Sequence, residues 1–69
     1  MVEVFKTNIH KISQAKKIMA LLLHHFPESK INFDLDDCDR VLKIAGKNFI
    51  PEKVMAVLNV NGFECKILE

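Results

Sequence analysis

The chain has 69 residues, of which 49% are apolar and 28% are charged, and its formal net charge is +1. This composition is typical of one small compact domain and excludes a disordered, collagen-like or disulfide-stapled chain. The balanced charge argues against binding to nucleic acid or to an anionic membrane. A domain of this size needs nearly all of its apolar residues for the core, so we expect no deep catalytic pocket.

The start of the chain and its cysteines indicate a cytoplasmic protein. Met1 is followed by alternating residues rather than by a basic stretch and an apolar run, so we expect no signal peptide. The longest apolar run, Ile18 to Leu23, is far shorter than the roughly 20 residues that span a bilayer, and membrane insertion is not expected. Cys38 and Cys65 match no zinc or redox spacing, and we expect both to be free thiols.

The first third of the chain predicts a strand followed by a helix. Residues 2–7 alternate with period two and are rich in β-branched and aromatic residues, as in a strand. Ser13 is the predicted N-cap of a helix that ends before Pro27. The apolar positions of this helix keep helical spacing: Ile12, Ala15, Ile18, Met19, Leu22 and Phe26.

A strand–turn–strand pair follows. Residues 30–35 alternate cleanly, with the apolar side chains Ile31, Phe33 and Leu35 on one face. Residues 36–39 are rich in aspartate, which favours a turn because its short side chain bonds the nearby backbone. Residues 40–44 form the predicted returning strand, which ends before Gly46.

The last third predicts a second helix and a final strand. Pro51 suits the first turn of a helix, and Asn61-Gly62 suits its end in a left-handed conformation. The predicted buried stripe of this helix comprises Val54, Val57, Leu58 and Met55. Residues 63–68 alternate again, and Cys65 falls on the inward set, where we expect a buried structural thiol.

The order β-α-β-β-α-β predicts a single α+β domain over residues 1–69 with a ferredoxin-like fold. Right-handed crossovers place both helices on one face of a four-stranded antiparallel sheet with strand order 4-1-3-2. Three connections, residues 7–13, 36–39 and 59–63, then meet at one end of the sheet. The uncovered sheet face is predicted to carry Glu3, Phe5, Asn32, Asp34, Val41, Lys43, Glu64, Lys66 and Leu68.

The pattern resembles the heavy-metal-associated (HMA) domain of copper chaperones and metal-pumping ATPases, over essentially the whole chain. The matching marks are Val2-x-Val4 leading into Thr7-Asn8-Ile9, then Ala15-x-x-Ile18-x-x-x-Leu22, Ile31-x-Phe33-x-Leu35, Pro51-Glu52-Lys53-Val54 and Gly62-Phe63. The resemblance implies a copper-chaperone-like fold, with the family's Cys-x-x-Cys metal site in the loop that leads into the first helix. Lys11 and Gln14 stand at those two cysteine positions, so the resemblance implies a degenerate metal site without its thiolates.

Other residues near this loop offer a second kind of metal site. His10 lies in the same loop, and Cys38 with Asp36, Asp37 and Asp39 lies at the same end of the predicted sheet. Mixed nitrogen, sulfur and oxygen ligands of this kind hold Zn(II) or Cu(II). The competing interpretation is an exposed loop histidine beside an aspartate-rich turn.

No pattern in the chain indicates catalysis. There is no nucleophile with a partner motif and no glycine-rich phosphate loop, since the chain has 2 glycines. We therefore expect a non-enzymatic domain that binds a protein partner or itself. Its expected contact residues lie in the loop, Lys11 and Gln14, or on the open sheet face, Phe5, Val41 and Leu68. The alternative is a metal-binding or metallochaperone-like protein that uses His10, Cys38 and the nearby aspartates.

Overall fold

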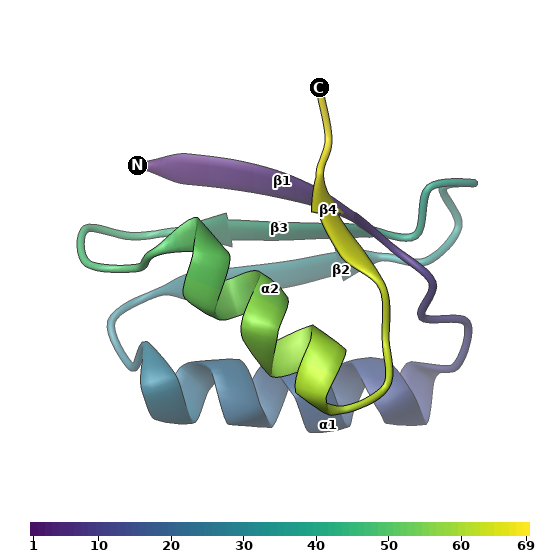
Figure 1. The fold of residues 1–69 in the computed structure, drawn as a ribbon, viewed down its shortest axis with the longest axis horizontal. Helices are drawn as coiled ribbons and strands as arrows, with labels where there is room; N and C mark the ends of the chain where they lie inside the picture. The colour runs from purple at the N-terminus through teal and green to yellow at the C-terminus, as the bar shows by residue number, and fades with distance from the viewer.

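A computed structural model describes all residues, 1–69, and contains the predicted elements in the predicted order (Figure 1). The strands and helices are β1 (Val2–Thr7), α1 (Ile12–His25), β2 (Lys30–Asp34), β3 (Val41–Ala45), α2 (Pro51–Val60) and β4 (Cys65–Ile67). Each boundary lies within about two residues of its prediction. Neither helix is long and apolar enough to cross a membrane.

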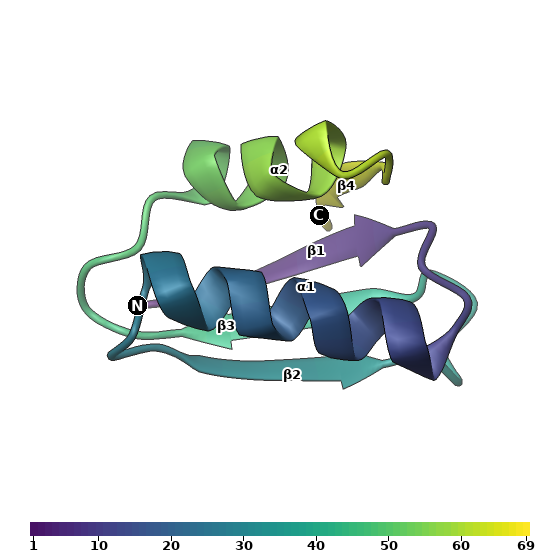
Figure 2. The ribbon, with the colours of Figure 1, turned by 90° about the horizontal axis from the view of Figure 1, so that it is seen from below.

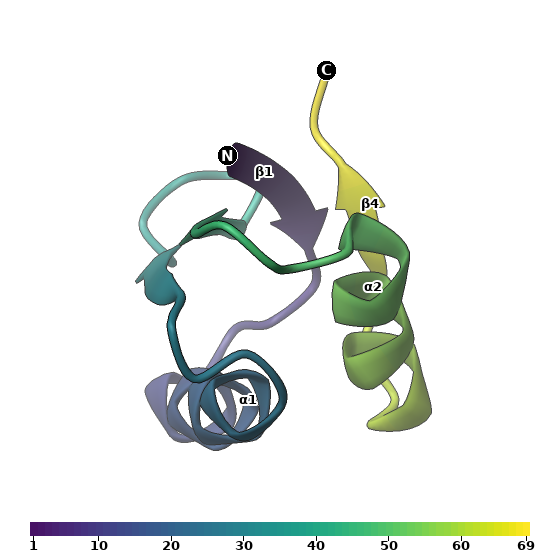
Figure 3. The same cartoon turned by 90° about the vertical axis from the view of Figure 1, so that its left-hand side faces the viewer.

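The strands form one antiparallel sheet in the order β2-β3-β1-β4. Both helices lie on the same side of this sheet, so the other side is uncovered (Figures 1 and 3). This is the predicted ferredoxin-like α+β fold with the predicted strand order. In such a two-layer fold the helices bury the inner face of the sheet, and its outer face stays open.

The core lies between the helices and the inner face of the sheet. It is one cluster of 13 buried residues: Phe5, Ile9, Ala15, Ile18, Leu22, Phe26, Ile31, Leu42, Ile44, Phe49, Val54, Leu58 and Cys65. Thr7 is the one buried polar residue, and its hydroxyl is fully used in hydrogen bonds described below. No buried side-chain nitrogen or oxygen lacks a partner, as expected for a well-packed interior.

The prediction that Phe5 lies on the open face is wrong. Phe5 is fully buried, and the strand register places it beside Leu42 of β3 and Ile67 of β4 on the inner face. Glu3 was predicted for the open face as well, but it lies on the inner side with Phe5, because alternate residues of a strand point to the same side. Val4 and Val2 are therefore the apolar residues of β1 on the open face. The larger ring of Phe5 buries more apolar area than either valine, which decides the orientation of the strand.

The predicted Ser13 cap is also wrong. α1 begins at Ile12 with Lys11 as its N-cap, and Ser13 lies exposed in the first turn. The Lys11 backbone N–H donates to Gln14 Oε1 at 3.4 Å, which is one half of a capping box. A lysine ammonium has no acceptor and cannot supply the other half. The helix therefore starts without a side chain that caps its free N–H groups.

The end of α2 follows the prediction. Gly62 has a φ of +88°, in the left-handed region, and directly follows the C-cap Asn61. The Phe63 N–H donates to the Leu58 carbonyl at 2.9 Å, and the Gly62 N–H donates to the Asn59 carbonyl at 3.0 Å. This pair of bonds is a Schellman motif, which turns the chain toward β4.

Candidate functional site

The three loops predicted to meet at one end of the sheet are joined by hydrogen bonds. The Thr7 N–H donates to the Asp39 carbonyl at 3.1 Å, and Thr7 Oγ1 donates to the Arg40 carbonyl at 2.6 Å. On the other side, the Glu64 N–H donates to Asn8 Oδ1 at 2.8 Å. The loop after β1 is thus tied both to the β2–β3 turn and to the start of β4, as the topology predicts.

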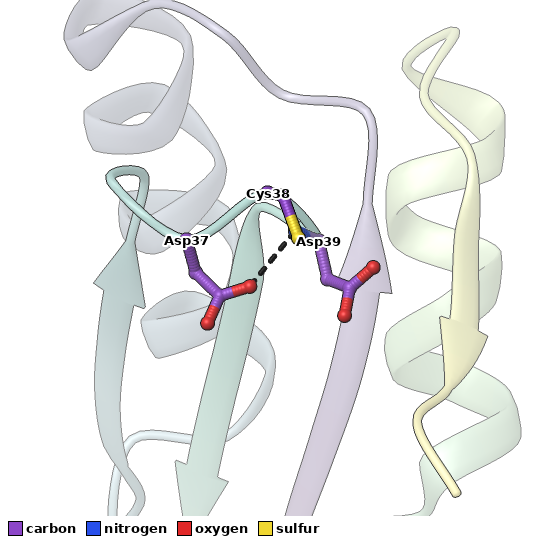
Figure 4. Close-up of side chains that lie close together, drawn as sticks. All are labelled: Asp37, Cys38 and Asp39. Atoms are coloured by element: carbon purple, nitrogen blue, oxygen red, sulfur yellow. Dashed lines mark hydrogen bonds between the residues drawn. The ribbon is translucent and has the colours of Figure 1, made fainter.

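The β2–β3 turn contains a group of side chains that offers ligand atoms to a metal. Single ligand atoms of Asp37, Cys38 and Asp39 all lie within 4.8 Å of one another (Figure 4). Asp37 and Cys38 are exposed, and Asp39 is partly buried. His10 is exposed in the loop after β1 and is not a member of this group.

Both carboxylates of this group already have partners within the protein. Asp37 Oδ1 accepts a hydrogen bond from the Asp39 N–H at 2.8 Å, the dashed contact of Figure 4. Asp39 Oδ1 lies 3.8 Å from Lys6 Nζ. The first contact is an Asx-type turn bond, which explains an aspartate at this position without an ion. The second places a positive charge where a cation would bind.

Arg40 closes the turn. It has a φ of +46°, a left-handed conformation that a residue with a Cβ adopts at a cost. Its Nη1 donates to the Leu35 carbonyl at 2.5 Å, across the turn. This bond and the Thr7 hydroxyl bond hold both ends of the turn in place, so the conformation is maintained by its neighbours.

Lys11 and Gln14 lie together at the start of α1. Lys11 is exposed and Gln14 is partly buried, and they share the hydrogen bond described above. As the N-cap of α1, Lys11 brings a positively charged side chain to the positive end of the helix dipole. This is an unfavourable place for a second cation.

The open face of the sheet carries lysines interleaved with apolar side chains. The registers place Leu68, Val4, Lys43 and Asn32 in one row across the sheet, and Lys66, Lys6, Val41 and Asp34 in the next. The exposed lysines of this face are Lys6, Lys30, Lys43 and Lys66. The apolar side chains Val4, Val41 and Leu68 are half-buried. Its acidic residues, Asp34 and Glu64, belong to opposite edges of the sheet.

Cys65 is a structural thiol, as predicted. Its side chain is 5% exposed and belongs to the core. Burial removes water from the thiolate form and raises the pKa of Cys65 to about 12. Cys38 is exposed, and both cysteines are free. Reactivity at neutral pH is therefore confined to Cys38.

Sequence reasoning missed three residues that matter here. Val4 is absent from the predicted open face, although it lies there. Ile9 and Phe49 were left out of the predicted core, although they are 0% and 3% exposed in their loops. The available signal is a large apolar residue that follows polar loop residues shortly before a helix start, which is typical of a loop anchored in the core.

Comparison with known protein families, with curated proteins and with solved structures finds no match for this chain. The resemblance to heavy-metal-associated domains remains a prediction from the sequence. Function is inferred from the two surfaces described above, the open face and the loop end of the sheet.

Proposed function

We propose that this chain is a non-enzymatic interaction module that binds an acidic protein segment through its open face. The observation that carries the proposal is the alternation of exposed lysines with the half-buried side chains Val4, Val41 and Leu68. The apolar side chains give a bound segment aliphatic surface to bury, and the neighbouring ammonium groups select carboxylates.

The chemistry of the open face favours protein over nucleic acid. Proteins that bind single-stranded nucleic acid on a sheet stack bases on aromatic side chains. The aromatic residues of β1 and β2, Phe5 and Phe33, point to the inner face instead, beside Leu42. The open face thus offers charge and aliphatic contact without a stacking platform.

The resemblance described above supports an interaction role rather than metal delivery. Lys11 and Gln14 occupy the positions of the two cysteines, and Lys11 brings a positive charge to the helix start. A domain that keeps this scaffold without the chelating thiolates retains surfaces for docking. Lys11, at the start of α1, offers a separate positive contact on the helix side of the sheet.

Metal handling is the second candidate, and the group Asp37, Cys38 and Asp39 is the observation that favours it. It ranks second because Asp39 pairs with Lys6 and Asp37 is used in the turn. A zinc titration, described in the Discussion, separates the two candidates.

The test of the proposed function is a titration followed by the backbone amide NMR shifts of the protein. A short peptide rich in glutamate and leucine is compared with the same peptide carrying lysine in place of glutamate. We expect the acidic peptide to shift the amides of Val4, Lys43 and Lys66, with an affinity that falls as salt is added. The basic peptide is expected to shift none of them.

A matched pair of variants locates the site. Lys43→Glu reverses one charge on the open face, whereas Lys17→Glu makes the same change on exposed α1, on the other side of the sheet. We expect Lys43→Glu to weaken the acidic peptide about tenfold and Lys17→Glu to leave it nearly unchanged. Equal binding of both peptides, or shifts confined to the helices, would refute the proposal.

A further inference from the structure

β2 is an edge strand with an unoccupied side. The sheet order gives it one neighbour, β3, and Figure 2 shows it as the outer border of the sheet, with α1 running alongside. The outer side of an edge strand presents backbone N–H and C=O groups that can pair with another strand. The outer side of β2 is therefore available for pairing with another strand.

The known hydrogen bonds identify these groups. The Gly46 N–H donates to the Met1 carbonyl at 2.9 Å, and backbone groups of alternate residues point to opposite sides of a strand. Leu42 and Ile44 consequently bond to β1, and the residues between them bond to β2. In the β2–β3 register, Asn32 is then a residue that bonds back to β3. The N–H and C=O groups of Ile31 and Phe33 point outward.

Both ends of this free stretch are closed by bonds within the chain. The Ser29 N–H donates to the Phe26 carbonyl at 3.1 Å. At the other end, the Leu35 carbonyl accepts from Arg40 Nη1. Ser29 and Leu35 lie equally far from Asn32 in the sequence. The free edge is therefore short and centred on Asn32.

We propose that two copies of this chain join through their β2 edges into a dimer whose two-fold axis passes beside Asn32. In this antiparallel register, Ile31 lies opposite the partner's Phe33, and such a pair exchanges both of its hydrogen bonds. Lys30 lies opposite the partner's Asp34, and the symmetry repeats this pair on the other side of the axis. The strand is thus complementary in charge to a second copy of itself.

The helix beside β2 adds apolar surface to the same edge. A groove of about 430 Å³ separates α1 from β2, and its apolar lining comprises Ile12, Ala15, Met19, Phe33 and Leu35. Ile12 is 68% exposed, and Leu23, four residues beyond Met19, is 39% exposed. Pairing at β2 extends the sheet and brings the partner's helix alongside α1. Burial of Ile12, Met19 and Leu23 of α1 against the partner's helix stabilises the dimer. The pairing involves Lys30 and Asp34 at the edge of the open face and leaves Val4, Val41 and Leu68 uncovered, so the dimer does not depend on the proposed function.

The first experiment measures sedimentation together with amide hydrogen exchange over a range of protein concentrations. We expect a monomer–dimer equilibrium in which the amides of Ile31 and Phe33 become protected from exchange as the fraction of dimer rises with protein concentration. The amides of Cys65 and Ile67 on the opposite edge serve as the internal comparison and are expected to keep their exchange rates. A protein that stays monomeric at millimolar concentration overturns the proposal. A dimer that leaves Ile31 and Phe33 unprotected overturns it as well.

A charge exchange tests the register. Lys30→Asp and Asp34→Lys each place like charges opposite one another, and they shift the net charge in opposite directions. We expect each to weaken the dimer about tenfold and the double variant to restore it. If one single variant strengthens the dimer while the other weakens it, and the double variant does not restore it, the effect follows net charge and the register is contradicted.

A third variant tests the axis. Asn32→Lys places two lysines side by side at the axis, while Asn48→Lys makes the same substitution in the exposed loop after β3. Asn32→Lys is expected to weaken the dimer, and Asn48→Lys to leave it unchanged. Equal dimerisation of the two variants overturns the proposal. Melting curves of the dilute monomers confirm that each variant folds.

Discussion

Thr7 Oγ1 donates to the Arg40 carbonyl at 2.6 Å and joins the end of β1 to the residue before β3. The same oxygen accepts from the Ile9 N–H at 3.2 Å, so one buried hydroxyl serves two backbone groups. This contact holds the loop after β1 against the β2–β3 turn. It explains why a polar residue lies in the core at this position.

Thr7→Val keeps the shape of the side chain and removes the hydroxyl, leaving the Ile9 N–H and the Arg40 carbonyl unpaired. We expect a loss of about 1–3 kcal/mol in the free energy of unfolding, measured by urea titration. Thr7→Ser keeps the oxygen and serves as the control, with a smaller loss. An equal loss in both variants would show that the methyl group, rather than the hydroxyl, matters.

The orientation of β1 is tested by alanine at neighbouring positions. Phe5→Ala removes a fully buried ring, and we expect it to cost about 3–5 kcal/mol in the free energy of unfolding. Val4→Ala removes less apolar area from a half-buried site on the open face and is expected to cost much less. Both are measured by urea titration. The reverse order would mean that β1 faces the other way.

The Cys65 thiol makes stability depend on alkaline pH. Its pKa is about 12 in the folded protein, against 9.0 for the free group, because burial disfavours the thiolate. Between these values the unfolded chain loses a proton that the folded chain keeps, so stability falls as pH rises. The fall is about 1.4 kcal/mol per pH unit in this range, in addition to any contribution from lysines. Cys65→Ala should lower stability at pH 7 but flatten this slope when both proteins are unfolded with urea. An unchanged slope would mean that the thiol ionises normally.

Gly62 is tested through its left-handed backbone. A Cβ at this position meets no atom within 4 Å, so the cost of substitution comes from the backbone alone. We expect Gly62→Ala to destabilise by about 1 kcal/mol, and Gly62→Asn to cost less because asparagine tolerates this conformation. Thermal melts of the two variants compare them directly. Equal melting temperatures of the Gly62→Ala and Gly62→Asn variants would argue against a Schellman motif at the end of α2.

Zinc distinguishes the two candidate functions. We expect Zn(II) to leave the melting temperature unchanged and to leave Cys38 open to alkylation, since Asp37 and Asp39 have protein partners. An ion that binds only the folded state would raise the melting temperature. Lys6→Ala removes the competing ammonium group and is the sensitised variant. Protection of Cys38 by stoichiometric zinc, lost in His10→Ala, would instead support the metal-handling candidate.

The fold was predictable because hydrophobic periodicity changes clearly from one element to the next. Ile31, Phe33 and Leu35 alternate as a strand, and Val54 and Leu58 keep helical spacing. β1 was oriented wrongly because it has apolar residues on both faces, so its alternation does not identify the inner side. The burial of Phe5 against Leu42 decides this, and that contact depends on pairing with β3.

The candidate site was predictable only in part. The lysines of β3 and β4 follow from strand alternation, and the convergence of the loops follows from topology. The left-handed Arg40 and its bond to Leu35 carry no sequence signature, since arginine rarely adopts this conformation. The partners of Asp37 and Asp39 depend on the exact path of the turn, which composition does not specify.

The central place of β1 affects the order in which the chain can assemble during synthesis. β1 is made before the other three strands of this sheet, yet it pairs with β3 and β4; Val2, for example, lies opposite Ala45. Only the hairpin of β2 and β3 joins neighbours in the sequence. A nascent chain therefore holds an unpaired apolar strand until that hairpin has emerged, and the sheet closes only once β4 has been made.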